Sequence, residues 1–309
     1  MTRISVAAAV LAAAFQILAA LASATAHAEI AVRDDTGQIV RLAAPARRIV
    51  SLAPHVTENL YAAGAGAYVV GAVEYSDYPA AAKKLPRVGG YSRLDLEAIA
   101  ALKPDLVVGW ESGNAPAHLA RLRALGLPVF LSQPQRIDDV AASIERLGEL
   151  AGTSAAANAA AKAFRVRQAE LRARYATRPP VRTFYQIWVE PLMTVNGEHL
   201  ISDVMRLCGG ENVFASLGQL APTVTVEAVL AADPEAIVAS GMGEARPEWL
   251  DNWKRWPRLQ ATARGNLFFI PPELVQRHTT RILDGADRLC THLETARSHR
   301  PSATGPGGR

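Results

Sequence analysis

The sequence lacks the features that would assign it to several large classes of protein. Its 33 Lys and Arg residues nearly balance its 29 Asp and Glu residues, so the formal charge of +4 gives no indication of nucleic-acid binding. No G-x-S-x-G, G-x-G-x-x-G, P-loop, H-E-x-x-H or C-x-x-C motif occurs, and common enzyme signatures are therefore missing. Half of the 309 residues are hydrophobic, which is enough to bury a large core.

Long hydrophobic runs are also missing, except at the N-terminus. Arg3 precedes an apolar run over residues 6–22, and Ala26-His27-Ala28 follows that run. This order is typical of a secretory signal peptide, here residues 1–28, whereas the alternative, a membrane anchor, would carry flanking charge. No Cys follows the cleavage site, which argues against a lipid anchor. The sequence therefore predicts an exported protein that does not insert into the membrane after cleavage.

Cysteine is scarce, since Cys208 and Cys290 are the only two. An oxidising compartment favours a disulfide between them. Closing a loop of about 80 residues would stabilise the fold by roughly 4–5 kcal/mol in the chain-entropy model. A metal site or a catalytic thiol is the alternative, but only His292 stands at ligand spacing from either cysteine. The other histidines are scattered, and we predict no metal site and no cofactor.

The order of segments predicts the fold class. From residue 47, short β-branched runs alternate with helical segments, which is typical of parallel sheets covered by helices on both faces. One long helix interrupts this alternation, which then restarts at residue 181. We predict an α/β fold of two βαβ-type lobes with parallel sheets, joined by one long backbone helix, with a ligand cleft between the lobes. The expected parts are an N-terminal lobe (47–152), the connecting helix (153–178), a C-terminal lobe (181–296) and a disordered tail (297–309).

An internal repeat supports the two lobes. Residues 96–108 can be laid over residues 226–238 at a constant offset, so that apolar, acidic, proline and strand positions coincide. Glu97 and Glu227 are matching members of the repeat, each near the start of a predicted helix. An acid there complements the helix dipole, which is a sufficient explanation for both. Placed on the same rim of two lobes, they could also dock two symmetric basic patches of a dimeric partner.

Aromatic residues make up only 6% of the chain, so their positions are informative. Several lie in loops or at predicted strand ends, where they suit the walls of a cleft for a large planar ligand. These residues are Tyr75, Tyr91, Trp110 and Trp188. Packing in the core is the alternative for the two tryptophans. Arg277, His278 and Arg281 follow another predicted strand, and we expect their loop to face the same cleft.

One short segment brings a histidine close to a carboxylate, as a catalytic site would. It contains His55 and Glu58, three residues apart, and Pro54 comes directly before it. Proline followed by these residues is more typical of the first turn of a helix. We therefore predict that the chain is not an enzyme.

Five segments carry a resemblance to a known family. They are residues 48–54 (R-I-V-S-L-A-P), 75–79 (Y-S-D-Y-P), 102–107 (L-K-P-D-L-V), 208–214 (C-G-G-E-N-V-F) and 281–283 (R-I-L). Over about residues 47–294 the chain resembles the helical-backbone (class III) periplasmic substrate-binding proteins of ABC importers. That family serves the import of cobalamin, haem and ferric siderophores. The second and fourth segments are most similar to its cobalamin-binding branch.

The resemblance implies a ligand between the lobes and no catalysis. Matched position by position, the implied ligand contacts are Tyr75, Tyr91, Trp110, Glu273 and Arg277. Tyr91 and Glu273 depart from the branch, which has Trp and Asp at these positions.

The C-terminal lobe departs further from the cobalamin-binding branch. Ile187, Met193 and Ala221 stand where that branch has aromatic residues, and Trp188, beside the first of them, is expected to compensate. The resemblance also implies the Cys208–Cys290 disulfide.

The resemblance assigns Glu97 and Glu227 to transporter docking, through arginines of the importer's membrane subunits. The sequence thus predicts a periplasmic monomer that captures cobalamin or a related corrinoid and delivers it to an inner-membrane ABC permease dimer. Haem or a ferric siderophore is the alternative ligand, and His278, Tyr75 or Tyr91 could then bind the haem iron.

Overall fold

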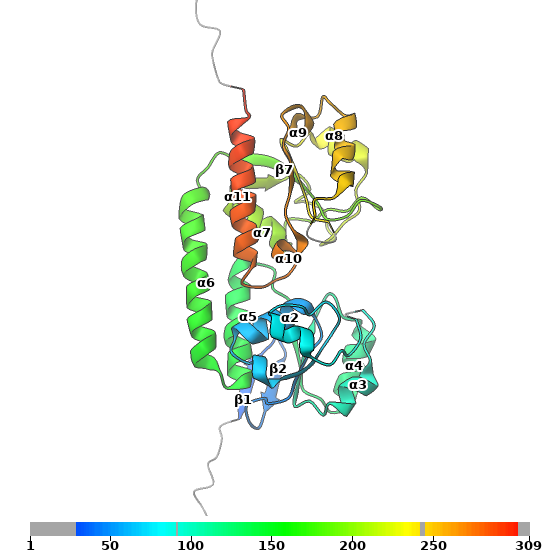
Figure 1. Ribbon diagram of the computed structural model, residues 1–309, viewed down its shortest axis with the longest axis vertical. Helices are drawn as coiled ribbons and strands as arrows, with labels where there is room; N and C mark the ends of the chain where they lie inside the picture. Colours follow the sequence, from blue (N-terminus) through cyan, green and yellow to red (C-terminus); the bar gives the residue numbers. More distant parts are fainter. Residues whose placement is uncertain (1–28, 91, 242–244, 302–309) are drawn as a thin grey trace, which may run out of the picture.

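The computed structural model describes residues 29–90, 92–241 and 245–301. The predicted signal peptide (residues 1–28) and the predicted ligand contact Tyr91 lie outside these ranges. The described chain forms two lobes, one above the other, with long helices along one side (Figure 1). No helix of the described ranges has both the length and the hydropathy that crossing a membrane requires.

The N-terminal lobe contains a four-stranded parallel sheet of order β4-β3-β5-β6. Every residue of β3 and β6 is buried, because helices cover both faces of the sheet. The strands are β3 (Ile49–Ser51), β4 (Val69–Ala72), β5 (Leu106–Trp110) and β6 (Val129–Ser132). The α-helices are α2 (Pro54–Ala62), α3 (Leu96–Ala101), α4 (Pro116–Ala124) and α5 (Ile137–Ala151), with short 3-10 turns η1 (Gly66–Tyr68) and η2 (Ala80–Lys84).

The C-terminal lobe has a second parallel sheet, of order β10-β9-β7-β8. Its strands are β7 (Val181–Gln186), β8 (Gly210–Asn212), β9 (Ala236–Ala239) and β10 (Leu267–Phe269). Its helices are α7 (Leu200–Leu207), α8 (Val226–Ala232), the 3-10 helix η3 (Glu248–Arg255), α9 (Gln260–Ala263), α10 (Pro272–Val275) and α11 (Ile282–Ser298).

The two sheets have the same topology. In each lobe the strands lie side by side in the order second, first, third, fourth along the chain. Helix α3 precedes the third strand of one lobe, and α8 precedes the third strand of the other. The repeat of residues 96–108 and 226–238 therefore occupies equivalent places in the two lobes, and the α/β fold of two lobes with parallel sheets is confirmed.

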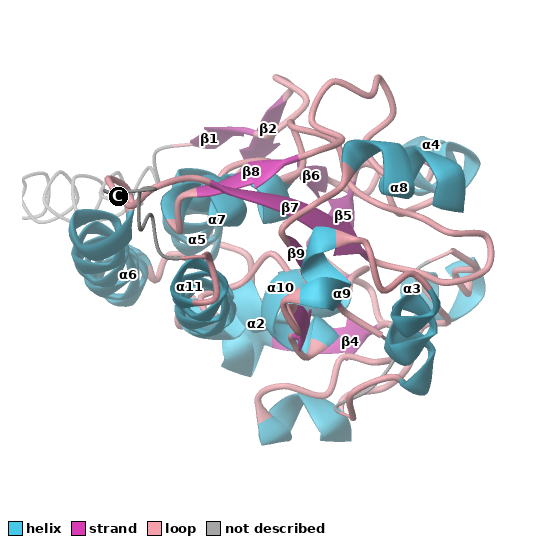
Figure 2. Ribbon diagram, turned by 90° about the horizontal axis from the view of Figure 1, so that it is seen from above, coloured by secondary structure: helices cyan, strands magenta, loops and turns pink. Residues whose placement is uncertain are grey.

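A long helix, α6 (Ser154–Tyr175), runs beside both lobes, next to α5 of one and α11 of the other (Figure 1). Its buried residues Ala157, Ala161, Phe164 and Leu171 recur every three to seven positions, which places them on one face. That face belongs to one hydrophobic cluster that continues through both lobes. Seen from above, α5, α6, α7 and α11 lie on one side of the strands and α3, α4 and α8 on the other (Figure 2). The lobes therefore share a core, which limits their relative motion.

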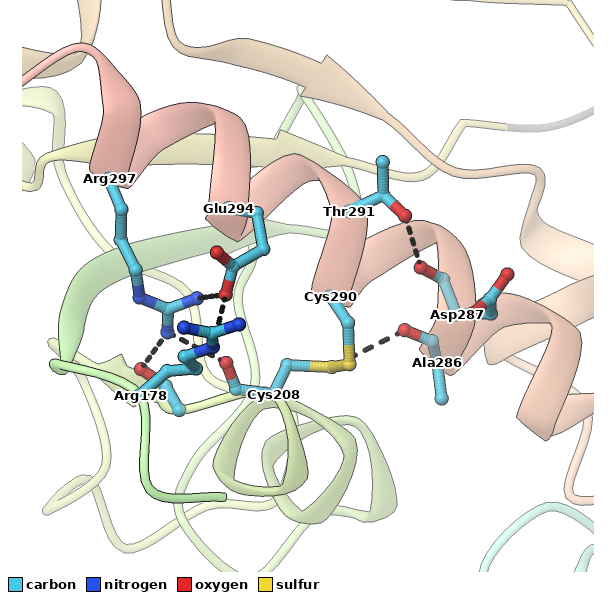
Figure 3. Close-up of a disulfide and its surroundings, with 9 residues drawn as sticks. Arg178, Cys208, Ala286, Asp287, Cys290, Thr291, Glu294 and Arg297 are labelled. Carbon is cyan, nitrogen blue, oxygen red and sulfur yellow. Dashed lines mark hydrogen bonds and ion pairs between the residues drawn. A yellow bond between two sulfur atoms is a disulfide. The ribbon is translucent and has the colours of Figure 1, made fainter. Parts of the chain in front are cut away.

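A disulfide bond joins Cys208, at the end of α7, to Cys290 of α11 (Figure 3). Both cysteines are fully buried. Next to the bond, Arg297 donates hydrogen bonds to the carbonyl oxygens of Cys208 (2.8 Å) and Gly209 (3.0 Å). Helix α11 is thus held to the C-terminal lobe by a covalent bond and by a cation on the carbonyls at the end of α7.

The N-terminal lobe begins before residue 47, which is the boundary that the sequence predicts. An antiparallel hairpin of β1 (Ile30–Arg33) and β2 (Ile39–Leu42) belongs to it. The side chain of Asp34 accepts a hydrogen bond from the backbone N–H of Leu131, and Arg146 on α5 forms an ion pair with Asp35 at 2.6 Å. These partners lie about a hundred residues away along the chain, so local sequence patterns do not indicate them.

The predicted disordered tail (297–309) is also corrected in its first residues. Helix α11 continues to Ser298, and Arg300 binds Glu235 with Nε at 2.7 Å and Nη2 at 2.9 Å. The partly buried ion pair between Arg300 and Glu235 therefore orders the first residues of a segment that its Pro/Ser-rich sequence predicts to be disordered. Residues 302–309 lie outside the described ranges.

Candidate functional site

A pocket of about 310 Å³ opens between the lobes at the carboxyl ends of the parallel strands. In sheets of this strand order, the first and third strands flank the point where ligands bind. Both lobes contribute side chains to the pocket. The lining residues are Trp110, Ser112 and Gln133 from the N-terminal lobe and Ile187, Trp188, Met193, His199, Ile201, Leu220, Gln276 and His278 from the C-terminal lobe.

A second hollow, of about 430 Å³, lies on the C-terminal lobe alone. It is lined by residues around α8 and α9, including Asp233, Arg255 and Trp256. This hollow is larger, but it touches neither the other lobe nor the carboxyl ends of the strands. The pocket between the lobes is therefore the candidate site.

Trp110 and Trp188 line this pocket from different lobes. Trp110 is the last residue of β5, and its backbone N–H donates to the Asn114 side-chain oxygen at 2.7 Å. The amide nitrogen of Asn114 in turn donates to the Leu52 carbonyl at 3.0 Å, so the end of β5 is fixed to its neighbour. In the other lobe, the indole Nε1 of Trp188 donates to the carbonyl of Glu190 at 2.9 Å. Each lobe thus presents an oriented aromatic side chain, as the sequence predicted for the ends of its strands.

Three histidines lie close together, and two of them, His199 and His278, line the pocket at what we call its floor. The ring centroid of His278 is 5.1 Å from that of His55 and 6.2 Å from that of His199, and the edge of Trp110 packs against both His55 and His278. Burial lowers the pKa of His55 to about 3, with a further contribution from Arg277, and burial lowers the pKa of His199 to about 4. Burial and the two neighbouring imidazoles lower the pKa of His278 as well. The floor of the pocket is therefore neutral at physiological pH.

A buried carboxylate joins the two lobes beside this floor. Glu58, on α2 of the N-terminal lobe, is only 5% exposed. It accepts a hydrogen bond from Arg277 (2.9 Å) and two from Arg281 (2.9 Å each), which come from the loop before α11 and from the residue at its start. We call these three residues the inter-lobe clamp. A carboxylate this deeply buried is retained only where charged partners satisfy it.

Further contacts extend the inter-lobe clamp. Arg277 also pairs with Asp77 at 2.6 Å and donates to the backbone carbonyl of Tyr75 at 3.2 Å. The Tyr75–Asp77 loop is itself held to α2, because Thr57 donates to the hydroxyl of the buried Ser76 at 3.0 Å. Beside Glu58, the side chain of Asn59 donates to the carbonyl of His278 at 2.9 Å. Loop, helix and opposite lobe therefore form one polar network.

Only some of the predicted ligand contacts lie in the pocket. Trp110 and Trp188 line the pocket. Tyr75 is 71% exposed in the loop bound by Arg277, and Arg277 belongs to the inter-lobe clamp. Glu273 is half-buried in the first turn of α10, and Tyr91 lies outside the described residues. The structure therefore brings Trp110 and Trp188 together in the pocket lining, whereas Tyr75 and Arg277 are not among the residues that line it.

The geometry around His55 and Glu58 does not resemble a catalytic pair. Both oxygens of Glu58 accept hydrogen bonds from arginines, and the buried Nε2 of His55 has no hydrogen-bond partner in the described part of the chain. A general base would need that nitrogen in contact with a reacting group. The described residues also contain no cluster of His, Cys, Asp and Glu that could hold a metal ion.

Several pocket residues had no signal in the sequence. Gln133 and Ser112 are common loop residues, and only their position just after the ends of β6 and β5 could have singled them out. Gln276 directly follows the short helix α10 and comes just before the predicted cleft residues Arg277 and His278. The pairing of Glu58 with Arg277 and Arg281 joins positions more than two hundred residues apart, which no local motif reports.

Two α/β lobes of equal strand order, a helix beside both and a pocket between them define a substrate-binding protein of the helical-backbone class. A family model described as "Periplasmic binding protein" matches residues 49–274. The vitamin B12-binding protein of Yersinia pestis is 44% identical to the chain over 248 residues, which are 80% of this chain and 86% of that protein. The chain belongs to the periplasmic binding protein family.

Solved structures agree with this family. The periplasmic vitamin B12 binding protein BtuF of Vibrio cholerae superimposes with a TM-score of 0.76 and 38% identity, over 82% of this chain and 98% of that one. A periplasmic heme binding protein from Pseudomonas aeruginosa superimposes with a TM-score of 0.69 and 25% identity, over 84% and 96% of the two chains. These relatives are named for what they bind and not for a reaction.

The first prediction concerns the inter-lobe clamp. Glu58→Gln keeps the side-chain shape but leaves Arg277 and Arg281 without their common counter-charge. Breaking a buried ion pair typically costs 3–5 kcal/mol, and since both arginines keep 18% side-chain exposure we expect about 3 kcal/mol. Urea denaturation measures the change. Glu145→Gln, which removes the half-exposed pair with Arg165, is the matched control and should cost no more than about 1 kcal/mol. Equal effects of the two substitutions would contradict the clamp.

The second prediction concerns pH. Below its unfolded pKa of about 6.5, a histidine takes up a proton in the unfolded chain, whereas His55 with its lowered pKa stays neutral in the folded protein. The free energy of unfolding should therefore fall as the pH drops from about 6.5 toward 3, by about 1.4 kcal/mol per pH unit for each such histidine. His55→Leu should remove one such contribution from the slope.

The measurement is the free energy of unfolding against pH for the native protein and His55→Leu. Above about pH 7.5 the histidine is neutral in both states, and the two slopes should coincide there. Parallel curves through the acidic range would show that His55 does not stay neutral on folding.

Proposed function

We propose that the protein captures cobalamin or a related corrinoid in the periplasm and delivers it to an inner-membrane ABC importer. Relatives that cover most of the chain are named for vitamin B12 binding, which supports this ligand. The proposal includes export by an N-terminal signal peptide, action as a monomer, and binding without catalysis or a cofactor.

The observation that carries the proposal is the charge of the pocket. None of the described residues that line it is Lys, Arg, Asp or Glu, and burial keeps its two histidines neutral. The cations that flank the pocket residue His278 in the sequence, Arg277 and Arg281, are paired with Glu58 and Asp77. A corrinoid is a broad, largely apolar ring with neutral carboxamides around its edge, which fits such a lining.

The alternative ligands fit this lining less well. Haem carries two carboxylates, and ferric siderophores bind iron with anionic groups, so both favour cations in the site. An axial haem ligand would also be needed. His278 is only 6% exposed with a buried Nδ1, and Tyr75 does not line the pocket. These observations favour the corrinoid.

Docking to the importer is proposed through Glu97 and Glu227. Both are exposed in the first turns of α3 and α8, which occupy equivalent places in the two lobes. Their helices start in the same way, with Asp95 and Thr225 each accepting a hydrogen bond from the backbone N–H three residues later. Two like-charged groups on matched elements suit a partner with two matched basic patches.

The third prediction tests the ligand. The purified mature protein should bind cyanocobalamin at a ratio of one to one with a submicromolar dissociation constant, measured by calorimetry and by tryptophan quenching. Trp110→Ala should weaken this binding about 10-fold or more, because it removes one aromatic wall of the pocket. Trp256→Ala, on the outer hollow of the C-terminal lobe, is the matched control and should leave the affinity unchanged.

Absence of binding at about 100 µM cyanocobalamin would refute the corrinoid proposal. Haem and then ferric siderophores would be titrated next. A Soret band in the purified protein would favour haem at the outset.

The fourth prediction tests docking. Glu97→Arg with Glu227→Arg should abolish ligand-dependent transport in vesicles that contain the cognate importer, because two attractive charge contacts become repulsive. Cyanocobalamin affinity should stay at the native value, since neither residue lines the pocket. Glu211→Arg, an exposed acid on β8 of the C-terminal lobe, serves as the control for charge reversal alone. Full transport by the double variant would refute the docking role.

A further inference from the structure

Three polar side chains of the pocket each have one end held by the protein. Gln133 accepts the backbone N–H of Ser112 on its Oε1 at 3.1 Å, which leaves its Nε2 amino group for the pocket. Gln276 donates its Nε2 to the hydroxyl of Ser240 at 2.7 Å, which leaves its Oε1. The direction in which each amide can bind a ligand is thereby fixed.

His199 is held in a similar way. Its Nδ1 accepts the backbone N–H of Ile201 at 3.1 Å and caps the start of α7. A neutral imidazole that accepts at Nδ1 carries its proton on Nε2, so His199 can offer the pocket an N–H donor. The same hydrogen bond occupies the Nδ1 lone pair of His199, so Nδ1 cannot bind a metal ion. In this tautomer Nε2 carries the proton and has no free lone pair for a metal ion either.

The three side chains together offer two donors and one acceptor, all neutral. A primary carboxamide has a carbonyl acceptor and an amino donor, so it can satisfy both kinds of group. A carboxylate has acceptors only. It would leave the Oε1 of Gln276 facing another oxygen, and no cation lines the described part of the pocket to compensate its desolvation.

We propose that His199, Gln133 and Gln276 determine specificity by reading primary carboxamides on the ligand and rejecting the corresponding carboxylates. This inference rests on the proposed function, because a corrinoid is the ligand whose edge carries such amides. Substitution of these three residues should therefore change which corrinoids the protein prefers, in addition to how tightly it binds them.

The experiment compares cyanocobalamin with its monocarboxylate derivatives, in each of which one edge carboxamide is hydrolysed. Calorimetry at about pH 7.5 keeps the carboxylates charged and the histidines neutral. The native protein should bind at least one of these derivatives about 10-fold or more weakly than cyanocobalamin, because a buried acceptor loses its partner. Equal affinity for cyanocobalamin and every derivative would overturn the proposal.

Two variants assign this selectivity to residues. His199→Ser keeps a side-chain acceptor that caps α7 but removes the N–H donor, so cyanocobalamin should bind about 5- to 10-fold more weakly at an unchanged thermal midpoint. Gln276→Lys replaces an exposed acceptor by a cation and should shift preference toward a monocarboxylate derivative. His118→Ser, on α4 away from the pocket, is the control and should change neither value.

The outcomes separate this inference from the proposed function. A native protein that binds cyanocobalamin, with both variants keeping its affinity and selectivity, would overturn the carboxamide-reading role alone. A native protein that binds no corrinoid would overturn both. If His199→Ser lowers the thermal midpoint, the Gln276→Lys comparison decides, because the Gln276 side chain is exposed and donates to the hydroxyl of Ser240 and not to the end of a helix.

Discussion

The arrangement of the two lobes depends on one buried carboxylate. Glu58 lies at the start of the N-terminal lobe, yet its partners Arg277 and Arg281 come from the other end of the chain. Removing one member of this network inside the folded protein would leave a buried charge without its partner, which typically costs about 3–5 kcal/mol. Together with the shared core under α6, this network joins the two lobes beside the pocket.

The same network explains why the pocket is neutral. The cations that the sequence places near the cleft, Arg277 and Arg281, are used to bind Glu58 and Asp77. What remains for the ligand is a pair of indoles, several aliphatic side chains and a few amide and imidazole groups. Such a surface gains affinity from apolar burial and gains selectivity from hydrogen bonds whose loss leaves a polar group unpaired. The charged side chains beside the pocket thus bind one another, and the groups that line the pocket are neutral.

Much of this fold is predictable from the sequence, because it is encoded locally and twice. The helix–Pro–strand block of residues 96–108 recurs at 226–238, and the helix at 154–175 has a composition that favours helix throughout. The positions of Trp110 and Trp188 at strand ends follow from the same alternation. The inter-lobe clamp, the N-terminal hairpin and the ion pair of Arg300 with Glu235 are not predictable this way, since each joins residues far apart in the chain. Burial of Glu58 decides the role of Arg277, and burial is a property of the whole fold.

The repeat also shows how equal topology produces unequal walls. Trp110 ends β5, and the residue at the same offset in the other lobe is Ser240, which follows β9 and holds Gln276 in place. The third strand of the N-terminal lobe thus ends in an aromatic side chain, whereas the third strand of the C-terminal lobe is followed by a serine whose hydroxyl binds Gln276. The C-terminal lobe supplies its indole from Trp188 instead, in the loop after its first strand β7. Equal topology therefore does not fix which strand end carries the aromatic side chain, and both lobes still bring one indole and at least one amide group to the pocket.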